Sequence, residues 1–210
     1  MIQESMFLAV APTLEIAEGS TGLLLARAAV GAGLAAHGAQ KLFGWFGGHG
    51  PKGTGQFFEG LGFRPGATFA VAAGLGELGG GLLLALGFLG PAGPTLVVVT
   101  MLVAILSVHR GNGFFAQNQG WELPLTYALV AAYVMFAGPG VYSLDAALGL
   151  ESLWTATNAW IALGVAGALA GASLAARRPA AEEPAAKVPA AAEDVEAEET
   201  EEERELVGAR

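Results

Sequence analysis

The sequence predicts an all-α, polytopic membrane helix bundle, and three observations support this. First, 53% of the residues are hydrophobic and only 14% are charged, whereas a soluble domain has about 25% charged residues. Second, the few charges are concentrated in the last part of the chain. Third, five apolar stretches approach or exceed the roughly 20 residues that a helix needs to cross a bilayer. Because backbone groups cannot stay unpaired in lipid, these stretches are predicted to be helices.

The five predicted spans follow the hydropathy of the chain. They cover residues 20–40, about 66–89, about 91–108, about 121–137 and about 153–176. Between the first two spans, the stretch "GTGQFFEGLGF" predicts a short helix that lies on the membrane or caps the bundle. The many Gly and Ala residues in the spans fit closely packed helices, with small residues spaced four apart on the second and fifth spans.

This pattern divides the chain into four parts. Residues 1–19 are interpreted as an interfacial segment, residues 20–150 as a four-helix membrane core, and residues 151–178 as a fifth transmembrane helix. Residues 179–210 hold eleven acidic and three basic residues, which gives them a net charge of −8. Because this tail is rich in Pro, Ala and Glu, it is predicted to be a disordered cytoplasmic tail.

The basic residues predict the orientation in the membrane. They lie after the first, third and fifth spans: Lys41, Lys52, Arg64, Arg110, Arg177 and Arg178. Cytoplasmic loops carry an excess of Lys and Arg. We therefore expect a multi-pass protein of the plasma membrane with its N-terminus outside, its C-terminus in the cytoplasm and residues 138–151 outside.

Two charged residues fall within predicted spans. Arg27 lies about eight residues into the first span, and Glu77 lies near the middle of the second. A charge at such a depth is expensive and marks a functional site by default. Counted from the outer surface, their depths differ by about one helical turn. We therefore expect a buried Arg27–Glu77 pair, which either fixes the helix register or serves the function.

Other polar groups cluster near the inner side. His37 ends the first span and Glu122 begins the fourth, so both are further candidate site residues. His37 and His109 have ring nitrogens that can ligate haem or metal. However, they lack a tight spacing and an acid-rich partner set, so no metal site is predicted. The absence of cysteine excludes disulfides, thiol chemistry and iron–sulfur clusters held by this chain.

The ordered motifs resemble those of the DoxX family of small bacterial and archaeal membrane proteins. The stretches that carry the resemblance, between about residues 23 and 149, are "LLLARAAVGAGLAAHGAQKLFGWFGG", "GTGQFFEGLGF", "GLGELGGGLLLALGFL", "NGFF", "WELPL" and "GPGVYSLD". The positions that match the family pattern are Arg27, His37, Gly38, Lys41, Gly62, Glu77, Gly113, Phe114, Glu122, Gly138, Gly140 and Asp145. The resemblance implies a four-helix membrane bundle, with some members linked to quinone-coupled oxidation of sulfur compounds and others to membrane redox-stress complexes.

Three functions remain open at this point. The first is a subunit of a membrane oxidoreductase that uses the quinone pool, with quinone as a possible cofactor. Whether such a subunit is itself catalytic stays open. The second is a non-catalytic scaffold that assembles soluble redox enzymes, which the absence of cysteine and of a cofactor motif favours. The third is a small-solute carrier, which ranks last because no inverted repeat is detectable. The expected partners are the lipid bilayer and soluble or membrane redox proteins, but no nucleic acid.

Overall fold

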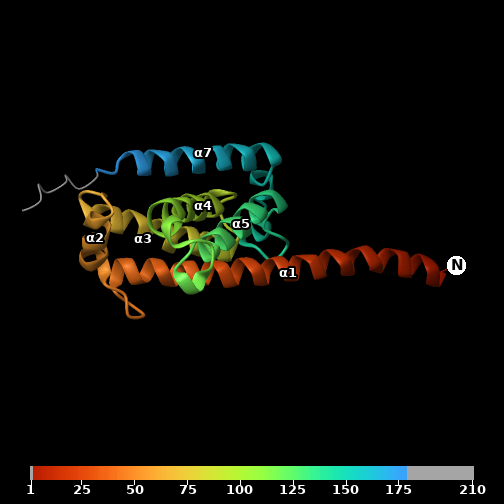
Figure 1. The fold of residues 1–210 in the computed structure, drawn as a ribbon. Helices are drawn as coiled ribbons and strands as arrows, with labels where there is room; N and C mark the ends of the chain where they lie inside the picture. The colour runs from red at the N-terminus through yellow and green to blue at the C-terminus, as the bar shows by residue number, and fades with distance from the viewer. Residues whose placement is uncertain (1, 179–210) are drawn as a thin grey trace, which may run out of the picture. The chain divides into compact units, whose positions relative to one another are not determined.

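The computed structural model describes the backbone of residues 2–178 and the side chains of residues 20–178. Within this range the chain is entirely helical (Figure 1). The α-helices are α1 (Ile2–Phe43), α2 (Gly50–Gly60), α3 (Gly66–Leu86), α4 (Ala92–Ala104), α5 (Glu122–Ala137), α6 (Leu144–Ala147) and α7 (Ala156–Ala175). Four short segments complete the fold: η1 (Ile105–His109), η2 (Arg110–Asn112), η3 (Ala116–Asn118) and η4 (Glu151–Leu153). The predicted disordered tail, residues 179–210, lies outside the described residues.

Four helical segments are long and apolar enough to cross a membrane, which confirms the predicted fold class. They are Ser20–Phe43, Gly66–Leu86, Ala92–Asn112 and Ala156–Ala175. The remaining predicted span forms α5, which is apolar but has only 16 residues. At 1.5 Å per residue it is about 24 Å long, shorter than the roughly 30 Å of the hydrocarbon layer.

Several helix ends differ from the predicted ones. Helix α1 begins at Ile2, so the backbone has no break between the expected interfacial segment and the first span. Helix α3 ends at Leu86 because Gly87 adopts a left-handed conformation with φ of 61°. Its N–H then bonds to a carbonyl of the last turn, which is a common way to end a helix. After α4 the helix widens into the π-helical segment η1.

Helices α1 and α3 pack so closely that glycine is required where they cross. A Cβ atom on Gly38 would lie 2.7 Å from the carbonyl oxygen of Gly74 and 2.7 Å from Cβ of Leu78. A Cβ on Gly31 would lie 2.7 Å from Cβ of Ala85. The two helices run antiparallel, and these contacts fix which residues of α1 lie opposite which residues of α3.

Small residues also bring α3 against α4, as the sequence predicts for its second span. A Cβ on Gly76 would meet the Thr100 side chain at 2.7 Å, and one on Gly80 would meet Cβ of Leu96 at 2.8 Å. The fifth span behaves differently. The positions of its glycines (Gly164, Gly167 and Gly171) have no atoms within 4 Å, so these residues do not pack within the bundle. Instead, α7 buries its alanines, among them Ala159 and Ala166.

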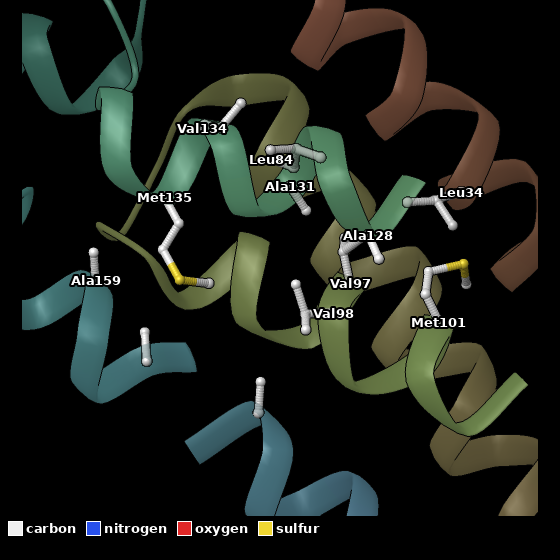
Figure 2. Packing of buried hydrophobic residues seen from close by; sticks show 12 residues of the cluster. Leu34, Leu84, Val97, Val98, Met101, Ala128, Ala131, Val134, Met135 and Ala159 are labelled. Carbon is white, nitrogen blue, oxygen red and sulfur yellow. The ribbon is translucent and has the colours of Figure 1, made fainter. Parts of the chain in front are cut away.

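The hydrophobic core lies where α4 meets α5 and α7 (Figure 2). Its members include Val97 and Val98 of α4, Met135 of α5 and Ala159 of α7. On the other side, Met101 lies beside Leu34 of α1. Figure 1 shows α7 on the side of α4 that faces away from α1.

The end of α7 is attached to the connection between α2 and α3. The Arg177 side chain donates from Nε to the Leu61 carbonyl at 2.9 Å, and its guanidinium lies 5.4 Å from the centre of the Phe63 ring. The backbone N–H of Arg178 donates to the Gly62 carbonyl at 2.7 Å. The basic residues after the fifth span therefore lie at the same end of the bundle as the basic loop between α1 and α3.

Candidate functional site

Arg27 is fully buried, but it does not pair with Glu77. Its two terminal nitrogens donate to the backbone carbonyls of Ala85, in the last turn of α3, and of Tyr142, in the loop after α5. Its Nε is buried without a partner among residues 20–178. Since the C-terminal end of a helix is the negative end of its dipole, this position suits a cation. Arg27 thus caps α3 and ties it to that loop.

The predicted Arg27–Glu77 pair is wrong because the register of α1 and α3 differs from the assumed one. The sequence prediction set residue 20 level with residue 89. The glycine contacts place Gly31 beside Ala85, and Arg27 bonds to the carbonyl of that same residue. Glu77 is eight residues before Ala85 on α3, a distance of about 12 Å along the helix. The arginine side chain bonds to the end of α3 and does not extend back along this helix to Glu77.

Asp145 is a second fully buried charge at this end of the bundle. Its carboxylate accepts from the backbone N–H groups of Leu89 at 3.0 Å and Gly90 at 2.7 Å, and from the indole N–H of Trp154 at 2.7 Å. Three hydrogen bonds to an ionised carboxylate are strong bonds. They hold the turn between α3 and α4 against α6 and the segment before α7, so the role of Asp145 here is structural.

We expect Arg27→Lys to destabilise the bundle by about 1–3 kcal/mol. Lysine keeps the charge, but its single ammonium cannot reproduce the fork that reaches two separate carbonyls. Thermal unfolding in detergent measures the loss. Arg110→Lys, at an exposed arginine, is the matched control and should leave the unfolding temperature unchanged. Equal unfolding temperatures for both variants would contradict the capping role.

Glu77 pairs with Lys41 instead. The Nζ of Lys41 lies 2.6 Å from Oε2 of Glu77, and the two side chains are 22% and 8% exposed. This is the one ion pair found within residues 20–178. Lys41 lies in the last turn of α1, which continues to Phe43 and so brings a residue assigned to a loop by the sequence prediction onto the helix.

The Lys41–Glu77 pair forms part of the wall of a cavity of about 430 Å³. This volume falls in the range of sites for small molecules, about 300–1,000 Å³. The rest of the wall is mainly apolar, with Phe57 and Phe58 from α2 and aliphatic residues from α4. The polar side chains on the wall include His37, His109 and Tyr127. Such a combination of apolar walls and a few polar groups is typical of ligand sites.

His37 and Lys41 of α1 lie on the wall of this cavity, and the residues around them hold them in place. The ring Nδ1 of His37 lies 3.1 Å from Oε1 of Gln40, and Nε2 of Gln40 donates to the Phe46 carbonyl at 3.2 Å. Lys41 follows His37 by four residues, so both side chains lie on the same face of α1. The glycine-rich loop then folds back, with the N–H of Gly44 bonded to the Gln40 carbonyl at 3.2 Å.

The structure also places the other candidate, Glu122. Its Oε2 accepts from the backbone N–H of Ala116 at 2.8 Å, and its own N–H donates to the Phe114 carbonyl at 2.9 Å. Glu122 therefore holds the loop before α5 and is not part of the cavity wall, although Leu123 and Pro124 are. Of the four candidates, only His37 and Glu77 share a site.

The sequence reasoning missed two members of this site. Lys41 was counted as a loop residue for topology and as a position of the family pattern, but not as a candidate site residue, although its spacing of four from His37 signals a common helix face. Tyr127 carried no signal, because an aromatic residue in an apolar helix is ordinary. Within the described residues, no group of three His, Asp or Glu side chains is arranged to hold a metal ion.

Comparison with known proteins agrees with the motifs. Residues 22–110 match the DoxX family. A protein of Haemophilus influenzae, described as an uncharacterized protein, is 35% identical over 83 residues, which cover 38% of this chain and 62% of that protein. The matched part is thus less than two thirds of the relative's length. No solved structure matches the chain. The part of the chain that is similar to the DoxX family thus extends from α1 to the first residue of η2.

Proposed function

We propose that the chain is a membrane subunit of a redox system and binds a quinone of the lipid phase in the cavity beside Lys41 and Glu77. The observation that carries this proposal is a cavity of about 430 Å³ with mainly apolar walls and a buried ion pair. A quinone needs an apolar slot for its ring and tail, and a few polar groups for its two oxygens. The cavity supplies both.

The polar groups suit the head of such a ligand. Lys41 has three donor hydrogens, and its contact with Glu77 uses one of them. Tyr127 lies on the wall of the same cavity, and a tyrosine hydroxyl can donate or accept. The aromatic rings of Phe57 and Phe58 can pack on the ring of the ligand. Since no cofactor-binding motif lies in the sequence, electrons would reach the quinone from a partner protein.

Binding of decylubiquinone tests the proposal. The purified chain in lipid nanodiscs should bind it saturably, and native quinone should co-purify in mild detergent. Ala104→Phe fills the cavity from α4 and should abolish binding, because Ala104 is on the wall. Leu106→Phe is the matched control, since Leu106 is 43% exposed and is not on the wall. Equal binding by the wild type and both variants would show that the ligand sits elsewhere.

The scaffold function is the alternative outcome of the same experiment. If no quinone binds but soluble redox proteins co-purify with the chain, and Ala104→Phe leaves this co-purification intact, then the chain acts as an assembly platform. Flux of a small solute through reconstituted liposomes, lost in Ala104→Phe, would instead favour the carrier.

We also propose the orientation of the bundle. The basic residues Lys52, Arg64 and Arg177 gather at the α2 end, which suits the cytoplasmic side. The chain has no cysteine, so single introduced cysteines can be labelled cleanly. In intact cells, an impermeant maleimide should label Val141→Cys and not Lys52→Cys, both at exposed positions. Labelling of Lys52→Cys alone would reverse the orientation.

A further inference from the structure

The polar groups on the cavity wall fall into two classes. The hydroxyls of Thr100, Ser107 and Ser173 donate to carbonyls of their own helices at 2.9, 2.5 and 2.8 Å. These three hydroxyl hydrogens are therefore already used, and they are not available to a ligand. The remaining groups, Tyr127, the two histidines and the Lys41–Glu77 pair, decide which ligand chemistry the cavity accepts.

His37 is held in one tautomer by a chain of two hydrogen bonds. The amide nitrogen of Gln40 donates to the Phe46 carbonyl, so the amide oxygen must be the atom that faces His37. An amide oxygen only accepts, hence Nδ1 of His37 carries the hydrogen. In the neutral ring Nε2 is then an acceptor, and it has no partner among residues 20–178.

His109 is held in the same tautomer by a different partner. Its Nδ1 lies 2.6 Å from the backbone carbonyl of Gln119, which can only accept. Its Nε2 is again an acceptor without a partner among the described side chains. Both histidines on the cavity wall therefore keep their hydrogen on the nitrogen bonded to the protein.

Glu77 adds a third acceptor close to His37. Lys41 bonds to Oε2, whereas Oε1 makes no hydrogen bond to residues 20–178. The register places the two side chains at a similar level, since Gly38 on α1 lies beside Leu78 on α3. A ligand that satisfies these acceptors must bring hydroxyl hydrogens, which a reduced, dihydroxy ring has and an oxidised, dicarbonyl ring lacks.

We propose that this cavity prefers the reduced form of the quinone, with a ligand hydroxyl donating to Nε2 of His37, and that Gln40 is the positioning residue that fixes this acceptor. This inference rests on the proposed quinone site. The loop supports it, because Gly48 packs so closely on Gln40 that a Cβ would lie 2.6 Å from Cβ of Gln40. The packed loop holds both Gln40 and the Phe46 carbonyl in place.

The tautomer is measured first, without any ligand. Nitrogen-15 NMR of the histidine side chains, at about pH 8 where an ordinary imidazole is neutral, should show His37 protonated on Nδ1. Gln40→Leu should mix the two tautomers, whereas Gln40→Glu should keep the wild-type pattern because it keeps an acceptor. His109 is the internal control and should not change. A His37 signal that is the same in wild type and Gln40→Leu would overturn the role of Gln40.

Binding then tests the preference. Reduced decylubiquinone, handled without oxygen, should bind about fivefold to tenfold more tightly than the oxidised form, as one hydrogen bond would predict. His37→Phe should remove this difference and leave binding of the oxidised form intact. Leu106→Phe is the control, since Leu106 is exposed and is not on the cavity wall. It should keep the preference.

The outcomes separate the two proposals. If both forms bind equally and His37→Phe changes neither, the preference is wrong while the quinone site stands. If neither form binds, the quinone site itself is wrong and the preference falls with it. Tighter binding of the oxidised form would reverse the assignment and make Lys41 and Tyr127 the groups that recognise the ligand.

Discussion

Gly38→Ala is expected to destabilise the bundle by about 3 kcal/mol and to loosen the packing of α1 on α3. The added methyl group would lie 2.7 Å from the Gly74 carbonyl oxygen and 2.7 Å from Cβ of Leu78. Both atoms belong to a packed helix and cannot turn aside as the end of a flexible side chain can. Overpacking of this kind costs about 1–3 kcal/mol and more when backbone must move.

A matched substitution on the same helix separates packing from helix propensity. A Cβ on Gly22 would have no atom within 4 Å, so Gly22→Ala should be neutral or stabilising by up to about 1 kcal/mol. Thermal unfolding in detergent compares the two variants. Gly38→Ala should also weaken quinone binding, because a shift of α1 moves His37 and Lys41. Equal unfolding temperatures for the two variants would mean that α1 and α3 do not approach this closely.

The fold class was predictable because it depends on hydropathy and length. A run such as Gly66–Leu86 is apolar apart from Glu77, and only a helix satisfies its backbone in lipid. The exact helix ends were harder to predict from the sequence. Helix α3 ends at Leu86 through the left-handed conformation of Gly87. Helix α1 runs on to Phe43, with Lys41 and Leu42 packed against Gly74 of α3.

The candidate site was only half predictable, for a geometric reason. Composition singles out Arg27 and Glu77 as charges in apolar segments, and both are indeed buried. Their partners depend on the register between two helices, which small contacts such as Gly31 against Ala85 decide. The contacts set residue 27, and not residue 20, level with residue 89, a shift of seven residues or about 10 Å along the helix, so Lys41 lies near the level of Glu77 and Arg27 does not. The cavity wall also includes residues of α2 and α4. These helices are distant in the sequence, so no local sequence pattern predicts that they line one cavity.

The polar positions that match the family pattern also divide into two groups. Arg27 and Asp145 hold helix ends and turns at one end of the bundle, and Glu122 holds the loop before α5. His37, Lys41 and Glu77 instead meet at the cavity. Along α1, Arg27 and Lys41 are separated by about 21 Å. A sequence pattern does not distinguish a charge that caps a helix from one that faces a ligand. The distinction comes from the partners: backbone carbonyls for Arg27, and another side chain for Lys41.

Removing Lys41 is expected to harm the protein more than neutralising Glu77. Lys41→Met leaves a carboxylate that is only 8% exposed without its cation, and breaking a buried pair in this way costs roughly 3 kcal/mol. In Glu77→Gln, the remaining lysine is 22% exposed and its long stem can turn the ammonium towards water. We therefore expect a smaller loss, about 1 kcal/mol.

The double variant Lys41→Met with Glu77→Gln should be more stable than the sum of the two losses predicts, by about 1–2 kcal/mol, because neither charge is left alone. Thermal unfolding in detergent for all four proteins gives this coupling. A second double-mutant cycle combines Arg27→Leu with Glu77→Gln. Here the two losses of stability should simply add, because Arg27 bonds to Ala85 and Tyr142 and not to Glu77. Coupling in the Arg27 cycle and additivity in the Lys41 cycle would restore the pair that the sequence alone suggests. Coupling only between Lys41 and Glu77 identifies the ion pair at the cavity as the one that the folded protein contains.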